Sequence, residues 1–94
     1  MTRRTSGAGA VDLVLEILSP GTQNRQRDLS AKRQLYGKYG VEEYWIVDKE
    51  NLSVSIFRLE GKTLKEIATL TGDDELTSPI LPGFHLQVNT IFNF

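Results

Sequence analysis

The chain has 94 residues, no cysteine and a formal net charge of -1, with 24% charged and 39% hydrophobic residues. This composition excludes disulfide bonds and thiolate metal sites. A mean hydropathy of -0.26, with no apolar run near the roughly 20 residues of a membrane span, favours a soluble globular protein of one domain at most. No secretory signal is visible, so we expect a cytoplasmic protein with no membrane partner.

Charge is unevenly distributed along the chain. Residues 1–38 carry seven Lys or Arg and three acids, whereas residues 39–94 carry four basic residues and nine acids. The basic part includes Arg25, Arg27 and Arg33, and such a cluster suits the phosphate backbone of DNA, although short basic clusters are as often solvated surface. These three arginines are therefore candidate DNA-binding residues.

The chain opens with MTRRTSGAGA, whose small, polar and unpatterned residues predict a disordered lead-in at 1–10. Residues 11–17, VDLVLEI, have the composition of a buried strand, in which Asp12, Val14 and Glu16 share one face. Glu16 is flanked by apolar residues. A carboxylate in such a place is either satisfied by a structural partner or used for chemistry.

A polar loop, LSPGTQNRQR, leads to a helix predicted over 28–39, with Asp28 as its N-cap. Lys32 lies in the middle of the apolar face, where it either snorkels to the rim or needs an anionic partner. If the helix packs back on the preceding strand, Lys32 meets Glu16, and Asp28 is the other candidate partner. At about 100° per residue the apolar residues fall within one arc: Leu29, Ala31, Leu35, Tyr36 and Tyr39.

Residues 43–47, EYWIV, predict a strand that is apolar on both faces, so the preceding strand, the crossover helix and this strand form a parallel unit. Residues 52–59 and 62–70 alternate as the two strands of an antiparallel hairpin. Residues 76–80 and 84–88 predict two more short strands before a last helical turn. The chain is therefore predicted to be α/β, with a mixed sheet, one crossover helix and antiparallel hairpins.

Four aromatic residues have the spacing of buried faces and are predicted to lie in the core. They are Tyr36, Tyr39, Tyr44 and Trp45.

Three segments, VDLVLEILSPGT, RDLSAKRQLYGKYGVEEYWIVD and LTSPILPGF, resemble in order and spacing the second half of the restriction endonuclease domains of the Uma family, within the PD-(D/E)XK nuclease superfamily. The resemblance runs from about Val11 to Phe94. It implies a restriction-endonuclease-like fold that is truncated at the N-terminus, with residues 11–94 as a partial domain.

The resemblance also implies roles for particular residues. Glu16 corresponds to the acid of the strand motif, and Lys32 to a catalytic lysine that has moved from the strand to the helix. Mg²⁺ or Mn²⁺ would be bound by Glu16 and the backbone carbonyl of Ile17, with Asp12 as a further candidate ligand. The family's other metal-binding aspartate lies upstream of this stretch. Water would then attack a DNA phosphodiester while Lys32 stabilises the transition state.

Two functions stay open at this point. One is an incomplete metal-dependent endonuclease domain, for which the small number of carboxylates predicts divalent-cation binding on the order of millimolar and no cleavage by this chain alone. The other is a non-catalytic, truncated remnant that binds nucleic acid or oligomerises. A domain without its first strands would leave residues 11–18 with an unpaired apolar edge, which predicts a homodimer or higher homo-oligomer.

Overall fold

A computed structural model of the chain describes residues 2–6, 10–18 and 25–92, and the side chains of residues 12–18 and 29–92. No helix within these ranges is both long and apolar enough to cross a membrane. The elements follow in this order: β1 (Thr2–Ser6), β2 (Ala10–Leu18), α1 (Arg25–Lys38), β3 (Glu43–Asp48), β4 (Ser53–Glu60), β5 (Thr63–Thr71), β6 (Glu75–Thr77), β7 (His85–Gln87) and α2 (Val88–Ile91).

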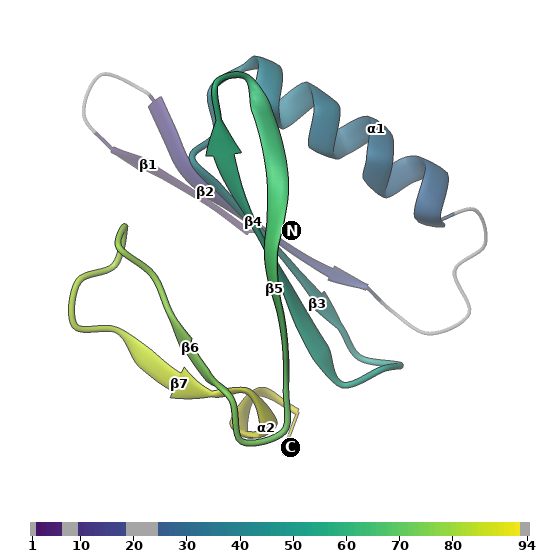
Figure 1. Cartoon of the computed structure of the whole chain (residues 1–94), viewed down its shortest axis with the longest axis vertical. Coiled ribbons are helices and arrows are strands. Elements are labelled where there is room, and N and C mark those ends of the chain that lie inside the picture. Colours follow the sequence, from purple (N-terminus) through teal and green to yellow (C-terminus); the bar gives the residue numbers. More distant parts are fainter. Residues whose placement is uncertain (1, 7–9, 19–24, 93–94) are drawn as a thin grey trace.

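β1 to β5 form one sheet in sequence order, and β6 and β7 form a separate hairpin. β2 and β3 are parallel and are joined by α1, whereas β3, β4 and β5 pair antiparallel. Figure 1 shows α1 on one side of this sheet and β6, β7 and α2 on the other. The predicted mixed α/β sheet, with its crossover helix and hairpins, is confirmed.

β1 corrects two predictions about the start of the chain. Thr2–Ser6 pairs antiparallel with β2, with Thr2 opposite Leu15 and Ser6 opposite Ala10, so a disordered lead-in is wrong for these residues. β2 therefore has a partner strand on each side, and the unpaired edge predicted at 11–18 is absent. TRRTS has no apolar alternation, so its strand depends on the hydrogen bonds that β2 offers and not on its own pattern.

Apolar side chains pack against both faces of the sheet, in two clusters. The cluster under α1 consists of Val14, Leu18, Leu29, Val41, Tyr44, Ile46, Phe57 and Leu64. The cluster on the opposite face consists of Leu13, Trp45, Val47, Val54, Ile56, Leu76 and Val88. Adjacent residues of β2 and β3 alternate between the two clusters, as extended strands require.

α1 differs from its prediction in where it begins and in which side it buries. It begins at Arg25, so Asp28 lies in its first turn and is not the N-cap. Tyr39 is 75% exposed, so its prediction as a core residue is wrong, and Leu35 is also exposed. The side that faces the sheet follows the spacing i, i+3, i+4, i+7 and i+8, and it consists of Leu29, Lys32, Arg33, Tyr36 and Gly37.

Gly37 explains how α1 can lie so close to the sheet. A Cβ atom at this position would be 2.7 Å from the carbonyl oxygen of Lys62 and 3.2 Å from the amide nitrogen of Leu64. A larger residue would therefore push the C-terminal half of the helix outward. Because Lys32 lies on the same helical face, Gly37 also helps to set the distance between Lys32 and β2.

Candidate active site

Glu16 is held on the buried face of a central strand. Its neighbours on that face, Val14 and Leu18, belong to the cluster under α1, and Glu16 itself is 7% exposed. Ile17, which points to the other face, is 51% exposed. A carboxylate in such an apolar setting needs hydrogen-bond donors to offset the cost of its burial.

Lys32 supplies the first of these donors. Its Nζ atom lies 2.9 Å from Oε2 of Glu16, and the lysine side chain is 36% exposed while that of Glu16 is 10% exposed. The strand and helix patterns predicted that these two side chains would meet, and they do. The ammonium lies at the border between the apolar interior and solvent, so Lys32 can reach a group outside the protein.

Tyr44 supplies the second donor, and it was missed as a site residue. Its hydroxyl donates to Oε1 of Glu16 over 3.2 Å, and the side chain is fully buried. The ring packs edge to face on Tyr36, with centroids 5.3 Å apart. The one sequence signal was the alternation of side chains along a strand, which places Tyr44 and Ile46 on the same face. Ile46 is paired with Glu16 in the parallel strands, so Tyr44 lies near Glu16.

The other predicted metal ligands do not form a complete donor set with Glu16. Asp12 precedes Glu16 by four residues, about 13 Å along a strand, although the pairing of β1 with β2 shifts register beside it, between Arg4 and Thr5. Among the described side chains, no three His, Cys, Asp or Glu residues come together. Glu16 and the Ile17 carbonyl are oxygen donors of the kind that Mg²⁺ takes, but they are only part of the six it needs.

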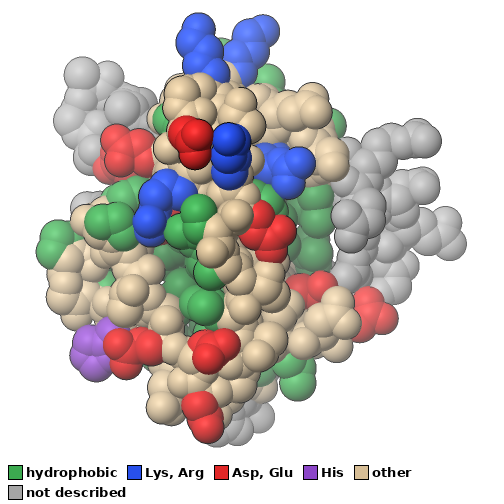
Figure 2. Space-filling model, viewed as in Figure 1, with side chains coloured by type: hydrophobic (Ala, Val, Ile, Leu, Met, Phe, Trp, Pro, Cys, Tyr) green, Lys and Arg blue, Asp and Glu red, His purple; other side chains and the backbone are tan. Residues whose placement is uncertain are grey.

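The structure describes the side chain of only one of the three candidate arginines, Arg33. Arg25 and Arg27 lie in the first turn of α1, and their side chains are outside the described part of the structure. Arg33 stacks on Phe57, with its guanidinium carbon 5.1 Å from the ring centroid. On the face shown in Figure 2, Lys and Arg side chains gather at the end where α1 stops and β4 turns into β5. Contact of these arginines with DNA stays a prediction.

A second buried glutamate, Glu43, lies on the opposite face of the sheet and was also missed. It is fully buried, and Oε1 accepts hydrogen bonds from Trp45 Nε1 at 2.7 Å and from the Ser78 hydroxyl at 2.8 Å. Oε2 accepts from Arg58, with distances of 3.1 Å to Nε and 3.0 Å to the second guanidinium nitrogen. Trp45 is on the same strand, but Arg58 and Ser78 are 15 and 35 residues away in sequence, so no local pattern could have revealed the whole network.

The fold is a mixed α/β sheet with a buried acid, Glu16, on β2 and a lysine, Lys32, on the crossover helix above it. A solved structure described as "a putative nuclease belonging to DUF820 from Anabaena variabilis" has this fold, with a TM-score of 0.70 and 22% sequence identity. The match covers 88% of this chain and 44% of that one, so the chain spans less than half the length of that relative.

The family model Uma2, described as "Putative restriction endonuclease", matches residues 2–89. The chain belongs to the Uma2 family. No curated protein matches it.

Proposed function

We propose that this chain is part of a metal-dependent endonuclease that hydrolyses DNA phosphodiesters. Glu16 is its metal-binding carboxylate, and Lys32 is its catalytic lysine. The observation that carries this proposal is the 2.9 Å ion pair between Lys32 and a glutamate buried under α1. Such a pair contributes little net stability, because desolvation offsets much of its Coulomb attraction. Because the pair lies in a nuclease-type fold, we infer that the pair serves catalysis and not stability.

The residues around the pair have separate tasks in this proposal. Tyr44 holds Oε1 of Glu16, while Lys32 can leave Oε2 and donate instead to a phosphate oxygen, where it stabilises charge that develops during hydrolysis. Mg²⁺ or Mn²⁺, where bound, would polarise the phosphate and provide an activated water. Glu16 and the Ile17 carbonyl are the ligands this chain would contribute, with Asp12 as a further candidate.

Calorimetric titration with Mg²⁺ and Mn²⁺ tests the proposal. We expect dissociation constants on the order of millimolar, because the described residues offer an incomplete set of oxygens. Binding should disappear in Glu16→Ala and persist in the matched control Glu60→Ala, which removes an exposed glutamate on β4. Divalent binding that is unchanged in Glu16→Ala would contradict the proposed site.

Nicking of supercoiled plasmid tests activity separately. We expect no measurable nicking by this chain alone, since a single carboxylate with one carbonyl rarely holds a catalytic Mg²⁺. Metal-dependent nicking that is lost in both Glu16→Ala and Lys32→Met would show that the site is complete within this chain or its oligomer.

A second candidate function is a non-catalytic module that binds nucleic acid or oligomerises. It is favoured by one observation: both carboxylate oxygens of Glu16 already accept hydrogen bonds, from Lys32 and Tyr44. If neither Mg²⁺ nor Mn²⁺ binds at Glu16, the non-catalytic function explains this site better than the nuclease function. A DNA partner, self-association and a cytoplasmic location stay predictions under both functions.

A further inference from the structure

A cavity of about 240 Å³ lies between α1 and the sheet, beside the Glu16 and Lys32 pair. Leu18 and Ile46 line it; Leu18 follows Glu16 by two residues, about 6.6 Å along the strand, and Ile46 is level with Glu16. The cavity is therefore at the carboxyl ends of the parallel strands β2 and β3. Open α/β sheets bind their ligands at this end of parallel strands.

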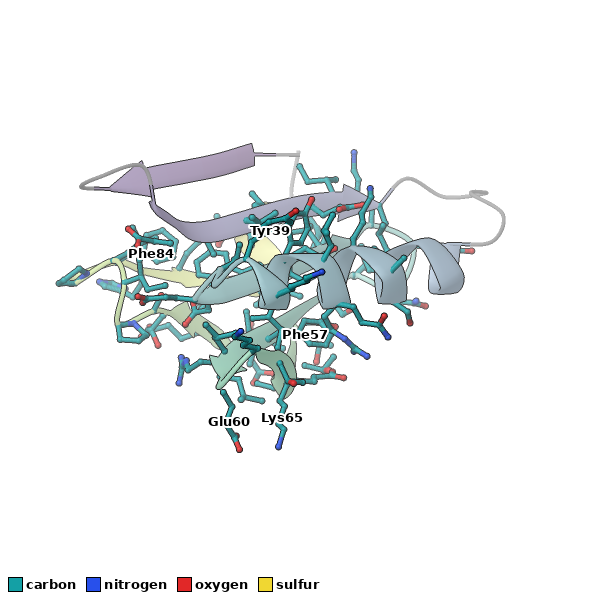
Figure 3. All side chains as sticks on the ribbon, turned by 90° about the horizontal axis from the view of Figure 1, so that it is seen from above. Tyr39, Phe57, Glu60, Lys65 and Phe84 are labelled. Carbon is teal, nitrogen blue, oxygen red and sulfur yellow. The ribbon has the colours of Figure 1, made fainter. Side chains whose placement is uncertain are left out.

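Arg33 forms one wall of the cavity, next to Lys32 on α1. Its guanidinium group stacks on Phe57, whose side chain lies beneath α1 in Figure 3. Stacking fixes the plane of the guanidinium and leaves the N–H donors at its edge. Among the described residues, none accepts a hydrogen bond from Arg33 or forms an ion pair with it, and we assign its N–H donors to a ligand.

The remaining polar groups of the cavity narrow the class of ligand. Asp48 and Glu66 contribute carboxylates, and Ser55 contributes a hydroxyl. Both oxygens of Asp48 already accept hydrogen bonds from Asn51, and Oε2 of Glu66 accepts one from Thr69, so we assign Oε1 of Glu66 as the acceptor for a ligand. Two carboxylates against one guanidinium disfavour a free anion, while the guanidinium disfavours a metal cation. A neutral, planar ligand with acceptors on one edge and donors on another satisfies both kinds of group.

The volume of the cavity limits the size of that ligand. Drug-sized ligands occupy about 300 to 1,000 Å³, so about 240 Å³ accommodates a single ring system and leaves a sugar and phosphate outside. The bases of DNA are ring systems of this kind. Guanine presents O6 and N7 as acceptors that match the arginine fork, and its amino group donates to a carboxylate.

We propose that this cavity binds a guanine base of DNA and that Arg33 determines the preference for guanine. The inference rests on the proposed function, because a base held beside Leu18 and Ile46 brings the phosphate of the same nucleotide towards Lys32. Enzymes that act on DNA can take a base out of the stack, at the least cost in mismatched or single-stranded regions.

Binding of mononucleotides to the intact chain, followed by amide chemical shifts without any metal, tests the inference. Deoxyguanosine monophosphate should shift the amides of Ser30, Asn51 and Ser55, and bind at least about tenfold more tightly than the adenine, cytosine or thymine nucleotide. Arg33→Met should abolish this binding. Arg33→Lys, which keeps the charge but not the fork, should lose the preference for guanine.

Lys38→Met is the matched control, because it removes an exposed cation from the same helix away from the cavity, and it should leave binding unchanged. Inorganic phosphate should not reproduce the shifts. Equal binding of all four nucleotides, shifts outside the cavity, no binding, or binding that survives in a folded Arg33→Met protein would each overturn the inference. Because the assay needs neither metal nor cleavage, its failure leaves the nuclease proposal untouched.

Discussion

Two buried glutamates lie on neighbouring strands of one sheet and face opposite sides of it. Glu43 is fully buried, and its oxygens accept hydrogen bonds from Trp45, Ser78 and the guanidinium of Arg58. Glu16 lies under α1 and accepts from Lys32 and Tyr44. The Glu43 carboxylate joins β3, β4 and the segment after β6. The Glu16 carboxylate joins β2, β3 and α1.

The difference lies in the donors. Arginine presents a planar fork that matches a carboxylate, while lysine is a compact charge on a flexible stem that changes partners easily. Glu43 is enclosed by donors from β3, β4 and the segment after β6, which leaves little room for a ligand. Both cations reach the solvent border, with 44% of the Arg58 side chain and 36% of the Lys32 side chain exposed. Among the described side chains Glu16 has two donors and Glu43 has three, so Glu16 is the less fully bound carboxylate and the one suited to chemistry.

Glu43→Ala should have the largest effect on stability. It leaves Trp45 Nε1 and the Ser78 hydroxyl without their acceptor and opens space in the core, so we expect a loss of about 3 kcal/mol or more. Urea denaturation measures it. The control Glu60→Ala breaks the exposed pair with Lys65, which projects from the end of the hairpin in Figure 3, and should cost less than about 0.5 kcal/mol.

Gly37→Ala should have the next largest effect. Alanine in place of glycine usually stabilises a helix, but here the new methyl group would meet the Lys62 carbonyl oxygen at 2.7 Å. We expect a loss of about 1 to 3 kcal/mol, together with changed amide shifts at Glu16 as Lys32 moves outward. A gain in thermal stability would show that α1 has room to spare and does not set the geometry of the pair.

Lys32→Met should cost about 1 to 2 kcal/mol, less than Glu43→Ala, because Glu16 keeps Tyr44 and its lysine partner is partly solvated. Adding Glu16→Gln should recover most of the loss, since the buried charge is then gone. Chemical denaturation of the single and double variants gives both values. A loss as large as that of Glu43→Ala would make the two glutamates equivalent and remove the distinction between them.

Tyr44→Phe should have the smallest effect, a loss of about 1 kcal/mol for one buried hydrogen bond to a carboxylate. The ring and its packing on Tyr36 and Phe57 remain. Tyr39→Phe is the matched control, since Tyr39 is 75% exposed, and it should leave stability unchanged. If both variants behave alike, the hydroxyl of Tyr44 contributes nothing to holding Glu16.

Local patterns predicted the unit of β2, α1 and β3 together with the meeting of Glu16 and Lys32, because alternation and helical spacing are properties of short segments. They did not predict β1, whose residues have no apolar pattern and need β2 as a partner. The buried side of α1 was predicted incorrectly because it contains two cations and a glycine, so that its apolar arc points partly to solvent.

Tyr44 and Glu43 show a second limit of sequence reasoning. Tyr44 was predicted correctly as a core residue, but its hydrogen bond to Glu16 depends on the register of the parallel strands. The donors to Glu43 are up to 35 residues away in sequence. Such contacts depend on tertiary packing, which local patterns in a single sequence do not predict.

Manganese-induced broadening of amide signals tests most directly whether Glu16 is the carboxylate that can exchange its protein donors for a metal. Mn²⁺ at millimolar concentration should broaden the amides of Glu16 and Ile17 first, and this broadening should disappear in Glu16→Gln. The amides of Glu43 and Ser78, on the opposite face, should broaden less at the same concentration. Broadening that is equal at both glutamates, or that persists in Glu16→Gln, would contradict the account.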